Sequence, residues 1–318
     1  MSLLIPNSND YHDAHGDLDQ DELYRQNIRS NYLFQPVSGL FKQTDLETDD
    51  MSFRYTDDNF GIKISYKDII KNLKELNDNA PENVQYKLLF LARHGQSFAN
   101  VVARKYTKEE WFAKWRYIGF DGEFTYGPDA DLTDLGIRQA LENNRAWKRQ
   151  LELGCPFPKS FYLSPLQRSI KTFNITWGED SLKRIENKED TINISPNLNP
   201  QVIEPLRETI GIHLCHKRSK KSELCSKFPY LQFSEEFPEE DLLFEEYNDV
   251  REKLYQQFMR IHTVLENIFE NDKNDVISIT SHAGTIRAFL TVINHRKFTI
   301  PTGGMIPVIV RAEKVDKS

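Results

Sequence analysis

The sequence predicts an α/β fold of three layers, in which helices cover both faces of a central, mostly parallel mixed sheet. Two observations lead to this prediction. Short apolar runs typical of buried strands alternate with longer segments that have helical spacing of apolar residues, and no internal repeat is visible. Alternation of this kind is typical of a sheet with helices on both faces.

Length and composition suggest one large domain with an N-terminal extension. The chain has 318 residues. Residues 1–60 are rich in Asp, Asn, Ser and Tyr and lack a sustained period, so we expect an extension that wraps the core or stays free of it. Residues 61–318 are expected to form a single domain with insertions near 105–131 and 209–240. If the extension is ordered, it should bury Tyr32, Leu33, Phe34 and Phe41.

Charge and apolar content exclude some classes of partner. The 48 acidic residues outnumber the 41 basic ones, and no basic stripe offers a surface for nucleic acid or an anionic membrane. No run approaches the roughly 18 apolar residues of a membrane span, and no secretory signal is visible. The three cysteines, Cys155, Cys215 and Cys225, lack metal-type spacing. We therefore expect a protein of the cytoplasm, with the nucleus as an alternative; the oligomeric state stays open.

The first half of the domain contains the most distinctive motif. A helix is predicted over residues 66–76, and the apolar run of residues 87–92 then stops on Arg93-His94-Gly95. A helix after Asn100 leads into an unusually aromatic stretch, residues 106–126, where interspersed glycines favour a loop. This stretch is either a lid over a pocket or a surface insertion that buries its aromatic side chains against the core.

The second half continues the alternation. Thr133 is a candidate N-cap for a strong helix. The elements that follow are predicted in this order: a strand over 160–164, a helix beginning near Pro165, a strand over 201–204, an irregular lysine-bearing insertion to about 240, one long amphipathic helix over 241–270, a strand over 275–280, a helix over 285–294 and a strand over 306–310.

Three strand ends carry residues suited to phosphoryl chemistry. His94, Glu208 and His282 each follow a predicted strand, and ligands of open α/β sheets bind beyond the carboxyl ends of the strands. A neutral imidazole can be a nucleophile, and the guanidinium of an arginine such as Arg93 suits bidentate binding of phosphate. Each of these residues alone is more often structural, but their convergence on one sheet edge favours a shared site.

The sequence motifs in these segments resemble those of the histidine phosphatase superfamily, whose fold is that of the phosphoglycerate mutase-like proteins. The run R-H-G-x-S-x-x-N at residues 93–100 is similar to its nucleophile motif. Further segments occur in the expected order between about residues 85 and 312: Leu132-Thr133-Asp134-Leu135-Gly136, Ser164-Pro165-Leu166-Gln167-Arg168, Leu206-Arg207-Glu208 and Ser281-His282-Ala283-Gly284. The run after Glu208 is also similar to related fungal phosphatases.

The resemblance implies a mechanism without metal or cofactor, acting on a small phosphorylated substrate. His94 would attack the phosphorus, and Glu208 would protonate the leaving alcohol and then activate water. The phosphoryl group would be bound by the remaining matched residues, which are Arg93, Asn100, Arg168, His282 and Ala283.

Phosphatase activity is favoured over the alternatives. The segment after Glu208 does not match the basic pattern expected of the mutases, and Gln96 stands where they usually carry glutamate. A mutase-type phosphotransferase and a non-catalytic, phosphate-binding regulatory protein remain as alternatives. The basic residues after Glu208 either recognise a second anionic group of the substrate or form a solvated loop; they are His213, His216, Lys217, Arg218, Lys220 and Lys221.

Overall fold

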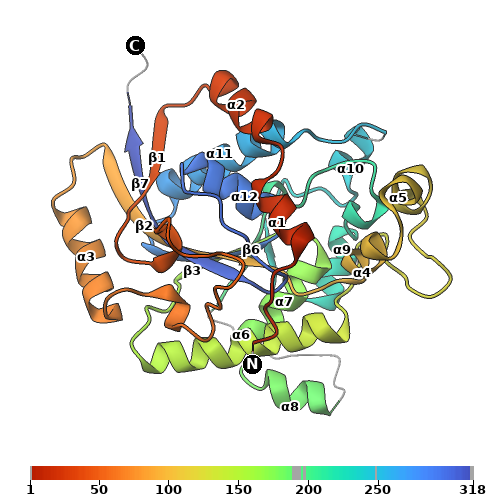
Figure 1. Cartoon of the computed structure of the whole chain (residues 1–318), viewed down its shortest axis with the longest axis horizontal. Helices are drawn as coiled ribbons and strands as arrows, with labels where there is room; N and C mark the ends of the chain where they lie inside the picture. The colour runs from red at the N-terminus through yellow and green to blue at the C-terminus, as the bar shows by residue number, and fades with distance from the viewer. Residues whose placement is uncertain (1, 188–194, 196–197, 248, 316–318) are drawn as a thin grey trace.

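A mixed sheet forms the centre of the structure, a computed structural model that describes residues 2–187, 195, 198–247 and 249–315 (Figure 1). Within these residues seven strands pair in the order β1-β7-β2-β6-β3-β4-β5. They are β1 (Tyr32–Pro36), β2 (Val84–Arg93), β3 (Ser160–Leu163), β4 (Gln201–Val202), β5 (Gln232–Phe233), β6 (Val276–Ser281) and β7 (Met305–Lys314). Only β7 runs against its neighbours, β1 and β2, so the predicted mostly parallel mixed sheet is confirmed.

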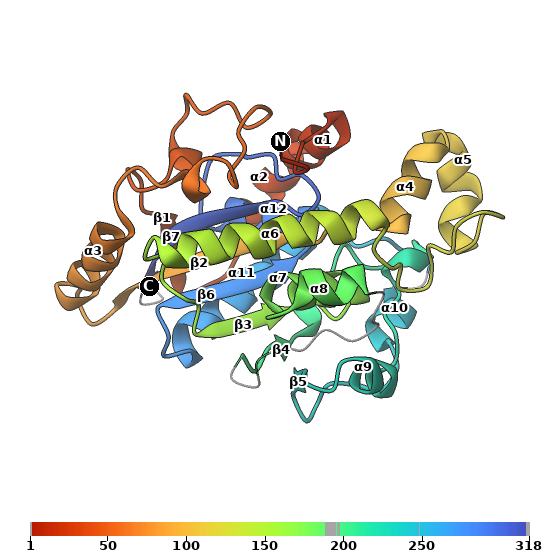
Figure 2. The ribbon, with the colours of Figure 1, turned by 90° about the horizontal axis from the view of Figure 1, so that it is seen from below.

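Helices cover both faces of this sheet, which confirms the three-layer prediction. Figure 2 shows α6 and α8 in front of the sheet and α11 and α12 behind it. The helices are α1 (Ser8–His15), α2 (Leu18–Asn27), α3 (Tyr66–Asp78), α4 (Phe98–Lys105), α5 (Lys108–Ala113), α6 (Asp134–Glu152), α7 (Gln167–Trp177), α8 (Ser181–Glu186), α9 (Lys221–Lys227), α10 (Leu242–Tyr247), α11 (Leu254–Asn271) and α12 (Ala283–Val292).

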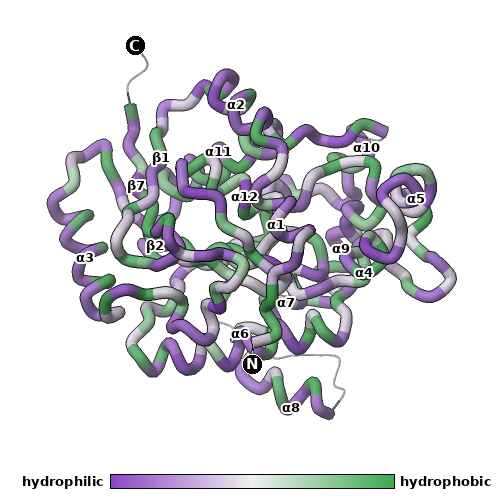
Figure 3. The backbone as a smooth tube through the Cα atoms, in the orientation of Figure 1, coloured by the Kyte–Doolittle hydropathy of each residue, from purple (hydrophilic) through white to green (hydrophobic). Residues whose placement is uncertain are grey.

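Strand β2 shows why its sequence is almost continuously apolar. Successive side chains of a strand point to opposite faces. Leu89 and Leu91 belong to the core formed with α11 and α12, whereas Leu88 and Phe90 belong to the core formed with α3 and α6. A strand buried on both faces needs apolar residues at every position. The tube in Figure 3 is correspondingly hydrophobic along the central strands and hydrophilic along much of its periphery.

The N-terminal residues pack on this core. Strand β1 pairs with β7, α1 packs against α12, and α2 packs against α11. Tyr32, Phe34 and Phe41 are buried, but Leu33 is 53% exposed, so the expectation for Leu33 was wrong. Alternation along β1 explains the difference, since Leu33 points away from the face that holds Tyr32 and Phe34.

Two predicted elements differ from the structure. The helix predicted over 241–270 is divided into α10 and α11, and Val250 between them is 67% exposed instead of buried. Glu252 explains the break, because its backbone N–H donates to Ile210 O (2.9 Å) and its carboxylate accepts from Arg260. The strand predicted over 201–204 is only β4, and it gives way to a 3₁₀ turn, Glu204–Leu206. Its central residue is Pro205, which has no N–H for a sheet ladder.

Across the described residues, none of the helices combines the length and the apolar character that crossing a bilayer requires.

Candidate active site

A cavity of about 390 Å³ opens where β2 ends. Six of the seven residues predicted for the site line it: Arg93, His94, Asn100, Arg168, Glu208 and Ala283. They come from strand β2, from helices α4, α7 and α12, and from the loop after β4. The sheet topology therefore brings together segments that are far apart in the sequence, as the convergence of strand ends suggested.

His94 is placed by the end of β2. Arg93 is in register with Ser281 of β6, and the His94 backbone N–H donates to Ser281 O at 3.0 Å. The chain then passes very close to the start of α6. A Cβ atom on Gly95 would lie 2.4 Å from Gly136 O, and one on Gly136 would lie 2.0 Å from Gln96 O. Only glycine fits at both places, which explains why both motifs carry it.

The imidazole of His94 has one nitrogen committed and one available. Its Nδ1 lies 2.7 Å from Gly95 O, and because a carbonyl can only accept, the ring proton resides on Nδ1. Nε2 thus keeps its lone pair and accepts a hydrogen bond from Arg168 Nε at 3.3 Å. Burial, together with the charges of Arg168 and Arg93, lowers the pKa of His94 well below its usual value. His94 is therefore a neutral, buried imidazole whose Nε2 carries no proton.

Two buried arginines flank His94. Arg168 donates from Nη1 to Cys215 O at 3.0 Å, which fixes its guanidinium beside the imidazole. Arg93 donates from Nη1 to Ile300 O (2.6 Å) and to Asp10 Oδ1 of α1 (2.7 Å). Arg93 Nε is buried and has no hydrogen-bond partner among the described residues. Both cations therefore retain the capacity to bind an anion that enters the cavity.

Helix starts supply further donors. Asn100 belongs to the first turn of α4, where its Oδ1 accepts from the Ser97 backbone N–H (2.9 Å), so its amide NH₂ group remains able to donate. Ala283 is the first residue of α12. Backbone N–H groups at a helix start lack intrahelical acceptors and favour anions. Both residues line the cavity, so a phosphoryl group bound there could make the predicted contacts with them.

His282 lies beside His94 but does not line the cavity. Its ring centroid lies 4.9 Å from that of His94, but the side chain is fully buried and the cavity-lining residues do not include it. The ring Nε2 and Ser164 Oγ are 2.7 Å apart, which ties His282 to the S-P-x-x-R segment. Burial and the nearby Arg168 lower its pKa well below the usual value. In this structure His282 supports His94 from within the protein.

Glu208 also lines the cavity, and its charge acts on Arg168. Its Oε1 accepts from the Thr209 backbone N–H at 3.0 Å. A Cβ atom on Gly284 would lie 2.5 Å from the same oxygen, so the Ala283-Gly284 motif leaves room for this carboxylate. The preceding residue, Arg207, is fully buried and forms a two-point ion pair with Asp241 at 2.6 Å for each contact. This pair anchors the segment that presents Glu208.

We predict that Asp241→Asn will destabilise the fold. It would leave the Arg207 guanidinium buried with a weakened partner, and breaking a buried ion pair typically costs about 3–5 kcal/mol. Glu240→Gln is the matched control, because Glu240 and its partner Lys220 are half exposed, and such surface pairs contribute at most about 1 kcal/mol. Urea unfolding measures both changes. Equal destabilisation by the two substitutions would argue against the anchoring role.

The cavity also contains residues that sequence reasoning missed. His12, Asp13 and Asp17 come from α1 and the turn after it, a segment that the sequence left as an uncommitted extension. Arg251 comes from the break between α10 and α11, where one helix was predicted. Weak helix formers precede Arg251, and this was the available signal.

The aromatic stretch has a part in each of the two proposed interpretations. Trp111 lines the cavity. It packs with Tyr126 and Cys215 in a small apolar cluster, while Phe112 and Phe120 are exposed. The stretch is thus both a wall of the cavity and a surface insertion with its own core.

The basic residues after Glu208 divide into two groups. His213 and His216 line the cavity, as does Cys215. Among the described residues, the lining does not include Lys217, Arg218, Lys220 or Lys221. Arg218 is buried in an ion pair with Glu204 (2.5 Å), so the idea of Arg218 as a substrate-recognising or solvated residue was wrong. Because Arg218 is itself buried and already paired with a carboxylate, its role is structural.

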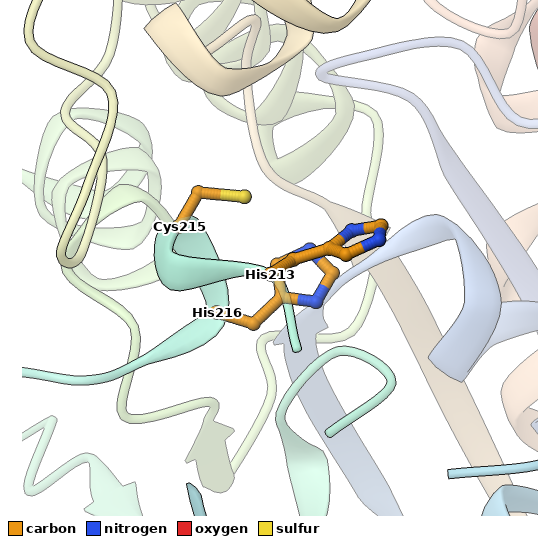
Figure 4. Close-up of side chains that lie close together, drawn as sticks. All are labelled: His213, Cys215 and His216. Carbon is orange, nitrogen blue, oxygen red and sulfur yellow. The ribbon is translucent and has the colours of Figure 1, made fainter. Parts of the chain in front are cut away.

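His213, Cys215 and His216 form a close cluster of metal-type ligands (Figure 4), in which the potential ligand atoms lie within 4.8 Å of one another. Its electrostatic surroundings disfavour a cation. The charges of Arg251 and Arg116 act on His213, and those of Arg251 and Arg168 act on His216. Burial raises the pKa of the Cys215 thiol to about 11, so the sulfur is not a ready thiolate. The cluster is better suited to meet an anion.

The buried histidines predict a dependence of stability on pH. His282 has a depressed pKa in the folded state, but in the unfolded chain it titrates near 6.5. Below that pH the unfolded state binds the extra proton, so stability is complete above about pH 6.5 and declines as the pH falls. We expect His282 to account for about 1.4 kcal/mol of lost stability between pH 7.5 and 5.5.

Urea unfolding of the wild type and of His282→Asn at both pH values isolates this contribution, since all other groups are shared. Identical pH slopes for the two proteins would contradict it.

The cavity is suited to binding and transferring a phosphoryl group. It combines a buried histidine whose Nε2 carries no proton with two flanking arginines, two helix starts and a nearby carboxylate.

No family model matches the chain. A "Probable phosphoglycerate mutase" of Arthroderma benhamiae is 33% identical over 296 residues, which cover 88% of this chain and 84% of that protein. The "Probable phosphoglycerate mutase PMU1" of Saccharomyces cerevisiae is 31% identical over 260 residues, covering 76% of this chain and 84% of that protein. Among solved structures, a mycobacterial glucosyl-3-phosphoglycerate phosphatase in complex with VO3 has a TM-score of 0.40 and 16% identity, over 73% of this chain and 100% of that chain.

The chain therefore belongs to the phosphoglycerate mutase-like proteins of the histidine phosphatase superfamily, and the resemblance seen in its motifs is confirmed. This superfamily includes both phosphatases and mutases, so membership leaves the reaction to be argued from the site.

Proposed function

We propose that the protein hydrolyses phosphomonoesters through a phosphohistidine intermediate on His94, without a metal ion. The observation that carries the proposal is the state of His94 itself. Gly95 O holds the proton on Nδ1, the lowered pKa keeps the ring neutral, and Nε2 faces Arg168 at the cavity. This is the protonation state that a nucleophilic imidazole requires.

The proposed reaction has two steps. His94 Nε2 attacks phosphorus while Glu208 gives a proton to the ester oxygen, so that the P–O bond breaks and an alcohol leaves. Glu208, now a carboxylate, takes a proton from water, and the water oxygen displaces His94 and releases inorganic phosphate. Arg93, Arg168 and the helix starts at Asn100 and Ala283 support the charge of the phosphoryl group in both steps.

The direct test is release of phosphate from p-nitrophenyl phosphate in the presence of EDTA. We expect turnover by the purified chain to be unaffected by the chelator, because protein cations stand where other phosphatases use metals. Turnover that disappears with EDTA and returns with a divalent cation would contradict the metal-independent mechanism. A complete lack of turnover would favour the non-catalytic phosphate-binding alternative.

Mutase activity is the second candidate, since curated relatives carry the name phosphoglycerate mutase. In a mutase the phosphoenzyme returns its phosphoryl group to a second hydroxyl and is protected from water. Incubation with 3-phosphoglycerate distinguishes the two reactions. Hydrolysis predicts inorganic phosphate as the main product, whereas accumulation of 2-phosphoglycerate without free phosphate would establish the mutase.

A further inference from the structure

Arg251 is a cation in the cavity wall that forms no ion pair with a described residue. It is half buried, lines the cavity, and its Nη1 is a fully buried atom without a hydrogen-bond partner among the described residues. Leaving a buried, charged donor unpaired is costly, so it calls for an explanation. The phosphoryl mechanism above does not use this residue.

In contrast to Arg251, three neighbouring arginines form ion pairs with carboxylates of the described residues. Arg207 pairs with Asp241, Arg218 pairs with Glu204, and Arg260 pairs with Glu252. The carboxylate next to Arg251 in sequence is therefore already occupied. Glu252 accepts from Arg260 and also from the Ile210 backbone N–H at 3.0 Å. These three arginines have internal acids, whereas Arg168 and Arg251 line the cavity and neither forms an ion pair with a described residue.

His213 provides a second unpartnered polar group on the same wall, an imidazole that can donate from Nε2 in one of its two tautomers. It lines the cavity, is only 8% exposed, and its Nε2 is buried without a partner among the residues described. The backbone before it is strained, because Ile212 has φ +63°, a left-handed conformation that is rare for a β-branched residue. Strain of this kind typically costs about 1–3 kcal/mol and gathers at functional sites. The next residue, His213, lines the cavity.

Charge and position indicate what these two groups bind. The charges of Arg251 and Arg116 act on His213, so an anion fits this wall and a cation does not. The charge of Glu208 acts on Arg251, which places Arg251 near the acid that serves the leaving group. The cavity, at about 390 Å³, also has room for a small molecule beyond its phosphoryl group.

We infer that Arg251 and His213 bind a second anionic group, a phosphate or a carboxylate, on the leaving-group part of the substrate. The inference rests on the proposed function, since it assumes that the first phosphoryl group lies at His94. It assigns recognition of the second anionic group to His213, which belongs to the run after Glu208, and to Arg251, which lies outside it. The lysines of that run then take no part in this recognition. The substrate class is therefore a small molecule with two anionic groups, one of which is a phosphomonoester.

Matched pairs of substrates test the inference. Fructose 1,6-bisphosphate and fructose 6-phosphate differ by a second phosphate, and 3-phosphoglycerate and glycerol 3-phosphate differ by a carboxylate. We expect the wild type to favour the member with the second anionic group in at least one pair. The preference in kcat/KM should be about 10- to 100-fold, as for a charge-assisted hydrogen bond. The pair that shows the preference identifies the kind of anion.

Substitution of Arg251 should remove this preference. Arg251→Gln is expected to reduce the ratio within the pair to about threefold or less, and Arg251→Lys should recover part of it, because charge returns without the planar fork. Lys217→Gln removes a charge from the neighbouring loop outside the cavity and should leave the ratio unchanged. Comparing ratios within each variant cancels any general loss of activity.

Calorimetric binding of the same compounds to His94→Ala, with and without Arg251→Gln, separates the inference from the proposed function. If the wild type hydrolyses neither these compounds nor p-nitrophenyl phosphate, the proposed function fails, and the binding ratio alone decides the anion subsite. If hydrolysis occurs but neither pair shows a preference, or Arg251→Gln retains it, the subsite is wrong and the hydrolytic function stands.

Discussion

Replacing His94 with alanine is expected to lower phosphate release by about four orders of magnitude or more, as for the loss of other enzymic nucleophiles. The neighbouring imidazole of His282 is poorly placed to replace His94, because its Nε2 lies against Ser164 and its side chain does not line the cavity. The measurement is the steady-state kcat for p-nitrophenyl phosphate in EDTA.

His295→Asn is a suitable control for this substitution. His295 is also buried and also places Nδ1 against a backbone carbonyl, that of Arg296 at 2.7 Å, but it lies outside the cavity lining. We expect it to retain activity near the wild-type value. Circular dichroism of both variants shows whether they fold. A folded His94→Ala protein with more than about a tenth of wild-type kcat would be incompatible with a nucleophilic His94.

Replacing Glu208 with glutamine is expected to have the second largest effect, and the effect should depend on the leaving group. General acid catalysis contributes about 10²- to 10⁴-fold. For an alkyl phosphate such as glycerol 3-phosphate, kcat/KM should fall by about this factor. For p-nitrophenyl phosphate, whose leaving group is a weak base, the fall in kcat/KM should be much smaller, about tenfold or less.

The same substitution should slow the second step, because Glu208 also activates water. The variant is therefore expected to release a burst of p-nitrophenol equal to the enzyme concentration, followed by slow turnover. Glu245→Gln is the control, since Glu245 is exposed, pairs only loosely with Lys217 at 3.9 Å and lies outside the cavity lining. A loss that is equal for alkyl and aryl phosphates, without a burst, would mean that Glu208 is not the acid.

Much of the site could be predicted because it depends on local sequence and sheet topology. The apolar run before Arg93 can only be a buried strand, and the parallel arrangement brings its end beside that of β6. The helix start after Thr133 follows from local capping, and this cap is present. Each of these features needs only a short window of sequence to be recognised.

The remaining features depend on contacts between distant segments. Asp10 pairs with Arg93 across 83 residues of sequence, and nothing near Asp10 indicates this partner. Arg251 was hidden because apolar spacing continues through a break that is imposed by Ile210 and Arg260. His282 was placed at the site by its motif and its strand end, whereas its contact with Ser164 and its absence from the cavity lining are seen only in the structure. Tertiary interactions override local pattern in each case.

The most direct test of the central claim is to identify the phosphorylated residue in rapidly quenched enzyme. After incubation with ³²P-labelled substrate, we expect a label on the enzyme that is stable in alkali and lost in acid. Mass spectrometry should place this label in the peptide containing His94. Glu208→Gln should accumulate more of this label, and His94→Ala should carry none. An acid-stable label, a label on another residue, or turnover without any labelled enzyme would contradict the phosphohistidine mechanism.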